Sequence, residues 1–244
     1  MTDDIDVKVL STTAMKAVFE ELAAVFDRET GYRLSISLGP SLQLERRLGE
    51  GEPADIAILA ADGANTLVAR GKIVAGSLVD IARSSVAVAV RKGTPKPDIS
   101  TPEAFKQAVL AARAIAVSKP EGGGQSGRHI AQVFANLGIA EAMRAKSLYG
   151  SGGPEGLTGL FLLRGEAELA IQQTSELMAV DGIDIVGPLP ASLQKVTLFT
   201  AGIPTSASEP EGGRALIEFL TAPAAKRVIK SKGLDPAQSA IVSY

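Results

Sequence analysis

The chain has 244 residues, of which 45% are hydrophobic and 21% are charged, and its formal net charge is −2. This balance is typical of a globular protein with a full core, and it offers no basic surface for nucleic acid or an anionic membrane. The chain has no Cys, which excludes a disulfide, a thiol nucleophile and a thiolate metal site.

The N-terminal segment 1–6 is acidic and leads directly into an apolar run, without a basic region or a hydrophobic region of the kind that export signals carry. The sequence therefore predicts either a cytoplasmic protein or a periplasmic one whose export signal has been removed. No apolar run reaches about 18 residues, so no transmembrane helix is predicted.

Strand-like and helix-like segments alternate along the chain, which predicts an α/β fold. The predicted strands are 7–10, 34–38, 55–59, 86–90, 115–117, 146–148, 169–173, 184–186 and 196–201. The predicted helices are 13–26, 42–48, 63–70, one beginning at Thr101-Pro102, 125–137, 154–164, 210–220 and 223–231.

The alternation breaks twice, at 79–90 and at 193–201, where strand follows strand without a helix. Two such breaks predict two lobes, each a mostly parallel sheet flanked by helices, joined by two crossing hinge strands. The first lobe is predicted to contain 1–82 and 198–244, and the second, inserted lobe 83–197. Ligands of open α/β sheets lie at the carboxyl ends of strands, which here face the cleft between the lobes.

Two loops at strand ends carry the strongest functional signal. Ser11, Thr12 and Thr13 precede the first long helix, and 121–129, with three consecutive glycines and Ser126, precedes the helix at 125–137. Backbone N–H groups at a helix N-terminus favour an anion. The structural alternative is that the hydroxyl residues are helix caps and that the glycines form a surface turn.

Several stretches resemble the periplasmic molybdate-binding proteins of ABC transporters. They are Ser11-Thr12-Thr13-Ala14-Met15, Leu38-Gly39-Pro40-Ser41-Leu42-Gln43-Leu44, Gly51-Glu52-Pro53-Ala54-Asp55-Ile56, Gly124-Gln125-Ser126-Gly127, Leu169-Ala170-Ile171-Gln172-Gln173 and Leu220-Thr221-Ala222-Pro223-Ala224-Ala225. The resemblance covers essentially the whole chain and implies a type II periplasmic-binding-protein fold with a hinged cleft.

In that family serine hydroxyls, backbone N–H groups and a tyrosine hold the oxyanion. The resemblance places the first hydroxyl on Ser11 or Thr12 and the second on Ser41. It places the oxyanion loop of the second lobe on Ser126 with its neighbours Gln125 and Gly127. The tyrosine position falls on Gln173.

Some residues depart from this pattern and favour an organic carboxylate over a metal oxyanion. Arg128 and His129 have no counterpart in the family, and Glu155 stands where the family has Val or Ala. Arginine binds carboxylates through two parallel hydrogen bonds. A branch of the wider family resembles aconitate isomerase, in which His129 would be the acid or base and Arg128 or Arg83 would hold carboxylates.

The sequence thus predicts the solute-binding protein of an ABC-type importer, a monomer that captures a small anion and works with a transporter permease. The alternative is an isomerase of unsaturated tricarboxylic acids on the same scaffold. The predicted ligand-binding residues are Ser11, Thr12, Thr13, Ser41, Gln125, Ser126, Gly127, Arg128 and Gln173, with His129 catalytic if the protein is an enzyme. No cofactor, metal or nucleic acid is predicted.

Overall fold

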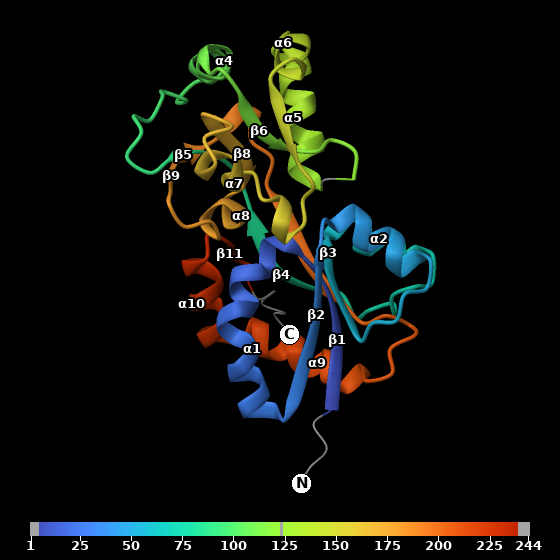
Figure 1. Ribbon diagram of the computed structural model, residues 1–244. Coiled ribbons are helices and arrows are strands. Elements are labelled where there is room, and N and C mark those ends of the chain that lie inside the picture. The colour runs from blue at the N-terminus through green and yellow to red at the C-terminus, as the bar shows by residue number, and fades with distance from the viewer. Residues whose placement is uncertain (1–4, 123, 239–244) are drawn as a thin grey trace.

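The computed structural model describes residues 5–122 and 124–238, which form two lobes, each built on its own β-sheet (Figure 1). The first sheet has the strand order β11-β4-β10-β3-β1-β2, and the second has the order β7-β6-β8-β5-β9. The strands are β1 (Ile5–Thr12), β2 (Tyr32–Gly39), β3 (Ile56–Ala60), β4 (Val79–Ser84), β5 (Val86–Arg91), β6 (Ile115–Ser118), β7 (Ser147–Gly150), β8 (Leu169–Gln173), β9 (Ile183–Pro188), β10 (Thr197–Gly202) and β11 (Asp235–Pro236).

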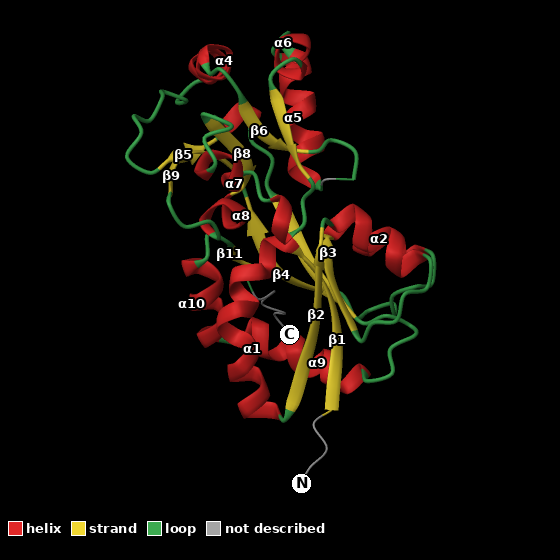
Figure 2. Ribbon diagram, in the orientation of Figure 1, coloured by secondary structure: helices red, strands yellow, loops and turns green. Residues whose placement is uncertain are grey.

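Helices cover both sheets (Figure 2). The first lobe contains the 3-10 turn η1 (Thr13–Met15), α1 (Lys16–Thr30), α2 (Ser41–Gly49), α3 (Ala61–Ala69), α9 (Pro210–Thr221) and α10 (Pro223–Ser231). The second contains α4 (Pro102–Ala111), α5 (Gln125–Asn136), α6 (Ala140–Arg144), η2 (Pro154–Gly156), α7 (Gly159–Leu163), α8 (Thr174–Met178) and η3 (Ala191–Leu193).

Strand alternation explains how each sheet buries both faces. On β1, Val7 and Val9 pack in the cluster formed with α1 and α9, whereas Leu10 packs with α2 and α3 on the other face. The second sheet does the same: Val88 belongs to the cluster with α4 and α5, and Ala89 to the cluster with α7 and α8. Each lobe therefore has three layers, and its core fixes the direction of its strands.

The two-lobed α/β fold predicted from the sequence is confirmed, with one correction. Both sheets are mixed rather than mostly parallel. The pairs β1–β2, β1–β3, β6–β7 and β6–β8 are parallel, and β3–β10, β4–β10, β4–β11, β5–β8 and β5–β9 are antiparallel. The reason is the connection between the lobes: β5 and β10 start where the chain crosses over, so they run away from the cleft while β1, β3, β6 and β8 run toward it.

The chain crosses between the lobes twice. It leaves the first sheet at Ser84 and enters the second at Val86, and it returns between Pro188 and Thr197. The two crossings meet where Thr197 pairs with Ser84. The sequence predicts one lobe at 1–82 with 198–244 and the other at 83–197. The first of these limits falls within β4, and the second falls after the first residue of β10. Both limits stay a prediction.

Most predicted elements are present within a few residues of their predicted bounds. Thr101 caps α4 as expected, because its hydroxyl accepts a 3.1 Å hydrogen bond from the Ala104 N–H. The helix predicted at 154–164 is instead split into η2 and α7. The Thr158 N–H donates to the Gln172 side-chain oxygen at 2.8 Å and so is not available to continue a helix. The short helices α6 and α8 were not predicted.

Candidate functional site

The carboxyl ends of strands from both sheets meet between the lobes, where they enclose a small interlobe cavity. Its volume is about 20 Å³, room for about one water molecule, so the lobes are closed. The residues that line it come from strand ends and the helix starts that follow them: Thr12, Pro40, Ser41, Gly124, Gln125, Ser126, Gln173, Glu176 and Phe199. Five of them, Thr12, Ser41, Gln125, Ser126 and Gln173, are among the ligand-binding residues predicted from the sequence.

The first lobe contributes hydroxyl groups. Thr12 ends β1 with a buried side chain that makes no capping hydrogen bond to the turn that follows. Ser41 begins α2 and its Oγ accepts a 3.2 Å hydrogen bond from the Ala60 N–H. A hydroxyl that accepts in this way keeps its own hydrogen for donation. Both residues are therefore suited to donate to an anion.

The second lobe contributes the N-terminus of α5. Gly124 precedes this helix with φ of +99°, and a Cβ at that position would lie 3.5 Å from the Pro40 side chain of the first lobe. The Ser126 hydroxyl donates to the Ser118 hydroxyl at 3.2 Å. The first backbone N–H groups of a helix have no partner within it. The loop therefore brings free N–H groups, Gln125 and Ser126 to the cavity. Of the glycine run predicted to form the loop, Gly123 lies outside the described residues.

Gln173 lies in the cavity wall and contacts both hinge crossings. Its amide group lies 3.0 Å from the Thr197 hydroxyl and 3.0 Å from the Ser84 hydroxyl. The orientation that satisfies both ends has the oxygen accepting from Thr197 and the nitrogen donating to Ser84. Gln173, predicted as a ligand residue, thus ties the second lobe to the two segments that would move on opening.

Glu176 is a site residue that the sequence analysis missed. It lies in the first turn of α8, is 7% exposed and lines the cavity. Burial raises the pKa of the Glu176 carboxyl to about 8, while the nearby Gln173 backbone N–H and Gln172 side-chain amide favour the charged form. The Gln172 nitrogen is buried and approaches the carboxyl without completing a hydrogen bond of standard geometry. A signal was available: Glu176 is the one charged residue between Leu169 and Val180 and follows a buried strand that ends at the cleft.

The other residues of the hydroxyl loop do not line the cavity. Ser11 is fully buried, and its Oγ lies 3.4 Å from the Thr12 carbonyl oxygen. Thr13 donates through its hydroxyl to the Gly152 carbonyl oxygen in the second lobe at 2.8 Å. Thr13 therefore joins the lobes beside the cavity.

Three predicted residues on α5 lie outside the cavity lining. A Cβ on Gly127 would lie 2.4 Å from the Lys119 carbonyl oxygen, so the glycine permits the helix to approach β6 closely. Arg128 is exposed and donates to the Gln125 side-chain oxygen at 2.9 Å. His129 is half-buried, and its Nε2 donates to the Leu193 carbonyl oxygen at 2.7 Å. Burial lowers the pKa of His129, and Lys195 adds to the effect although the bond to Leu193 opposes it.

A larger outer hollow of about 560 Å³ opens beside the cavity. It has the same two walls, the start of α2 and the loop before α5, and it adds the cations Arg46 and Lys119 together with Glu121. Its lining residues are Leu42, Gln43, Arg46, Lys119, Glu121, Gly122, Ser151 and Gly153. Arg46 and Lys119 therefore belong to the same two elements, α2 and the segment before α5, that line the cavity.

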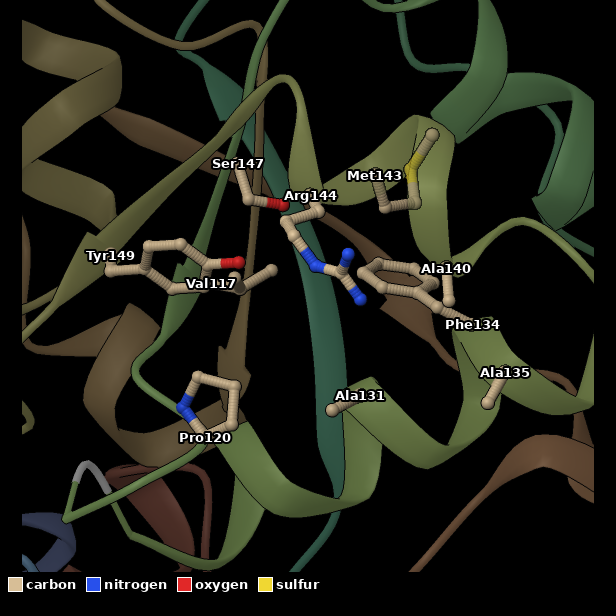
Figure 3. A pocket seen from close by; sticks show the side chains of 10 residues that line it. All are labelled: Val117, Pro120, Ala131, Phe134, Ala135, Ala140, Met143, Arg144, Ser147 and Tyr149. Atoms are coloured by element: carbon tan, nitrogen blue, oxygen red, sulfur yellow. The ribbon is translucent and has the colours of Figure 1, made fainter.

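A separate hollow of about 310 Å³ lies on the second lobe between α5, α6 and the strands β6 and β7 (Figure 3). Its lining is mostly apolar, with Phe134 and Met143 among its walls and Arg144 and Tyr149 at its polar parts. It contains none of the residues predicted to bind the anion.

Within residues 5–122 and 124–238, no group of three or more His, Asp or Glu side chains could hold a metal ion. The helices in the same ranges are all too short or too polar to cross a bilayer.

Comparisons with known proteins show the family to which the chain belongs. The profile of a family described as "Bacterial extracellular solute-binding protein" matches residues 7–235. An aconitate isomerase from Pseudomonas sp is 36% identical over 234 residues, which are 93% of this chain and 87% of that protein. The molybdate-binding protein ModA from Azotobacter vinelandii is 26% identical over 93% of this chain and 89% of its own. The solved periplasmic molybdate-binding protein of Azotobacter vinelandii superposes with a TM-score of 0.79, covering 95% of this chain and 100% of that one at 22% identity.

Proposed function

The chain belongs to the bacterial extracellular solute-binding proteins, and we propose that its lobes close on a small organic carboxylate that it delivers to an ABC-type importer. The observation that carries the proposal is the convergence of donors from two lobes on one cavity. Thr12 and Ser41 come from the first lobe, and Gln125 and Ser126 from the second. Donors on both sides of a hinge bind a ligand best when the hinge is closed, so binding favours the closed form.

The donors in the cavity are neutral, which suits an anion that is stripped of water. Hydroxyl and backbone N–H groups satisfy the lone pairs of an oxyanion without a counter-charge. A carboxylate is preferred to a metal oxyanion because Arg46 and Lys119 in the outer hollow would hold a second carboxylate. The aconitate isomerase relative, at 36% identity, supports the same ligand class.

In this function the protein works in the periplasm and meets a transporter permease when its lobes are closed. The family supports the periplasm. The permease and the monomeric state are part of the proposal and follow from the role of such proteins in import.

A second candidate function, isomerisation of an unsaturated tricarboxylic acid, is favoured by Glu176. Conversion of trans- to cis-aconitate by an allylic shift removes a proton from the methylene carbon, moves the double bond by one position and adds a proton at the former vinylic carbon. One proton leaves and one proton is added, so the reaction balances without a second reactant. A group that exchanges protons near neutral pH is needed, and Glu176, with a pKa raised to about 8 by burial, meets that need inside the cavity.

Thermal denaturation of the purified protein with a panel of anions tests both candidates. The panel contains molybdate, tungstate, sulfate, citrate, cis-aconitate and trans-aconitate. A ligand at 100 times its dissociation constant stabilises the native state by about 2.7 kcal/mol, which raises Tm by about 5–10 °C for a chain of this size. We expect the carboxylates to raise Tm.

The outcomes separate the alternatives. A rise with molybdate or tungstate alone would identify a metal-oxyanion carrier and overturn the carboxylate proposal. If trans-aconitate raises Tm, proton NMR of the mixture then shows whether cis-aconitate appears. Conversion supports the isomerase, and binding without conversion supports transport.

A further inference from the structure

The buried carboxyl group of Glu176 has no role in the proposed capture of an anion, yet it lies in the wall of the cavity that would hold it. We infer that Glu176 contacts the bound anion as a neutral carboxylic acid, and that anion binding in the interlobe cavity therefore depends on one proton on this side chain. The inference deepens the proposed function and rests on it.

The first support is geometric. Glu176 is 7% exposed and shares the cavity wall with Thr12 and Ser41 from one lobe and Ser126 from the other. Because Glu176 lines the same small cavity as these hydroxyls, an anion that they hold after the lobes have moved apart to admit it would lie against the carboxyl group. The remaining lining residues, all described, carry no charge that would pair with it.

The second support is the absence of a nearby cation on the described elements that pack against α8. These are chiefly η1, β5, β8 and β9, and α7, which shares a core cluster with α8, has no charged side chain. The turn η1 and strand β8 have no titratable side chain. On β5 and β9 the charged residues are Arg91 and Asp184, at the end of the sheet away from the Val86–Gln173 pair. Near the other side of α8, Gly233 follows Lys232, which pairs with Glu21 at 2.7 Å. No ion pair therefore compensates an ionised Glu176.

Removing a carboxylate from water without a cation favours its neutral form. The raised pKa of Glu176, about 8, is the result of this burial. At neutral pH the side chain is therefore mostly a carboxylic acid, whose O–H donates a hydrogen bond. An anionic ligand accepts that bond, whereas an ionised Glu176 would repel it.

The site then selects an oxyanion or carboxylate that accepts a hydrogen bond from a neutral acid, and each bound anion requires one proton on the protein. Affinity is highest below the pH at which Glu176 titrates in the empty cavity. Above pH 8, each further unit lowers the neutral fraction by up to tenfold.

Isothermal titration with trans-aconitate and, in parallel, molybdate at pH 7, 8 and 9 tests the inference. The wild-type protein is expected to bind the anion about tenfold more weakly at pH 9 than at pH 7. Glu176→Gln keeps the shape of the side chain but cannot ionise, so its affinity should be the same at both pH values. Glu176→Asp keeps a titrating carboxyl and should keep a pH-dependent affinity. Glu103→Gln, which changes an exposed glutamate of α4 in the second lobe, is the matched control and should behave as wild type.

The results distinguish this inference from the proposed function. No binding of either anion by the wild-type protein at pH 7 would overturn both. Binding that is independent of pH in the wild type, or an undiminished tenfold fall in Glu176→Gln, would overturn the role of Glu176 and leave anion capture intact.

The Tm of the ligand-free protein, measured as a function of pH, tests the protonation of Glu176 even if a variant binds no anion. The pKa of Glu176 in the folded state is raised to about 8. The stability that the neutral side chain contributes is therefore full below the pKa of the unfolded state and is lost as the pH rises through about 8. The Tm of the wild type should therefore fall relative to that of Glu176→Gln between pH 6 and pH 9. A constant difference in Tm would contradict a neutral Glu176.

Discussion

The Thr13 hydroxyl in the first lobe donates a 2.8 Å hydrogen bond to the Gly152 carbonyl oxygen in the second. Both residues are buried, and they stand beside the interlobe cavity at the point where β1 gives way to η1. A buried carbonyl that loses its donor costs free energy. The bond therefore stabilises the closed form and links the first helix start to the loop after β7.

Thr13→Val is expected to weaken closure. The substitution replaces the hydroxyl by a methyl group of similar size and leaves the Gly152 oxygen without its donor. A hydrogen bond of this kind contributes about 0.5–1.5 kcal/mol, so anion affinity should fall by about 2- to 13-fold. Calorimetry gives the affinity, and small-angle X-ray scattering should give a larger radius of gyration for the free variant.

Thr66→Val is the control for the Thr13–Gly152 bond. The Thr66 hydroxyl also donates to a backbone carbonyl, that of Asp62, but Thr66 lies on the exposed side of α3 in the first lobe. It should leave affinity and radius unchanged. Equal behaviour of the two variants would show that the Thr13–Gly152 bond does not govern closure.

Ser126→Ala is expected to weaken anion binding by about tenfold, which corresponds to about 1.4 kcal/mol and the loss of one hydrogen bond to a charged acceptor. The Ser126 hydroxyl lies in the cavity wall and needs only to turn from Ser118 to reach a ligand. The Tm of the ligand-free protein should fall by only about 2–4 °C, because one hydrogen bond to Ser118 is lost. Ser192→Ala, at an exposed serine of η3, should bind as wild type. Equal affinity in Ser126→Ala would remove the α5 loop from the site.

Much of the fold follows from the sequence because local signals and burial agree there. The apolar run around Ile56 can be satisfied only as a central strand with both faces covered, and the Thr101-Pro102 pair marks a helix start. The direction of β5 and β10 could not be read in this way. It depends on where the chain crosses between the lobes, which is a tertiary property.

The site was predictable in part for a similar reason. Hydroxyl residues at strand-to-helix junctions, such as Thr12 and Ser41, carry a local signal for anions. Glu176 also follows a buried strand, but the sequence does not show its raised pKa, because that arises from the packing of α8 against several strands. The signal from Gly127 is ambiguous, since a missing side chain permits a close approach of the Lys119 carbonyl as well as of a ligand.

His129→Ala is expected to reduce stability without affecting the anion. The imidazole Nε2 donates to the Leu193 carbonyl oxygen outside the cavity lining, and loss of that bond costs about 1 kcal/mol, or about 2–4 °C in Tm. Burial lowers the pKa of His129 in the folded state. The neutral imidazole therefore stabilises the fold at pH values above the pKa of the unfolded state, and this stabilisation is lost as the pH falls through the pKa of the folded state. The difference in Tm between wild type and variant should therefore shrink below pH 6. A loss of trans-aconitate conversion in a well-folded His129→Ala would instead assign the proton transfer to the imidazole.

Asp55 ties together the starts of β3 and α9 and the strand β1. Asp55 is 1% exposed, and its carboxylate accepts hydrogen bonds from the backbone N–H groups of Lys8 at 2.8 Å, Ser208 at 2.9 Å and Glu209 at 2.8 Å. Burial alone would raise the pKa of Asp55, but these hydrogen bonds outweigh it and lower the pKa below its ordinary value. The charged form is thus the one that the fold requires.

Asp55→Asn should destabilise the protein by about 3 kcal/mol at pH 7, because an amide nitrogen would face N–H donors that now bind a charged oxygen. The folded-state pKa of Asp55 is lowered, so its stabilisation is present above about pH 4, the unfolded value, and is lost as the pH falls through the folded value. Urea denaturation at pH 7 and at pH 3 measures the difference, which should be smaller at pH 3. Asp62→Asn, at an exposed residue of α3, is the control. A destabilisation that is equal at the two pH values would mean that the shape of Asp55, and not its charge, holds these three elements together.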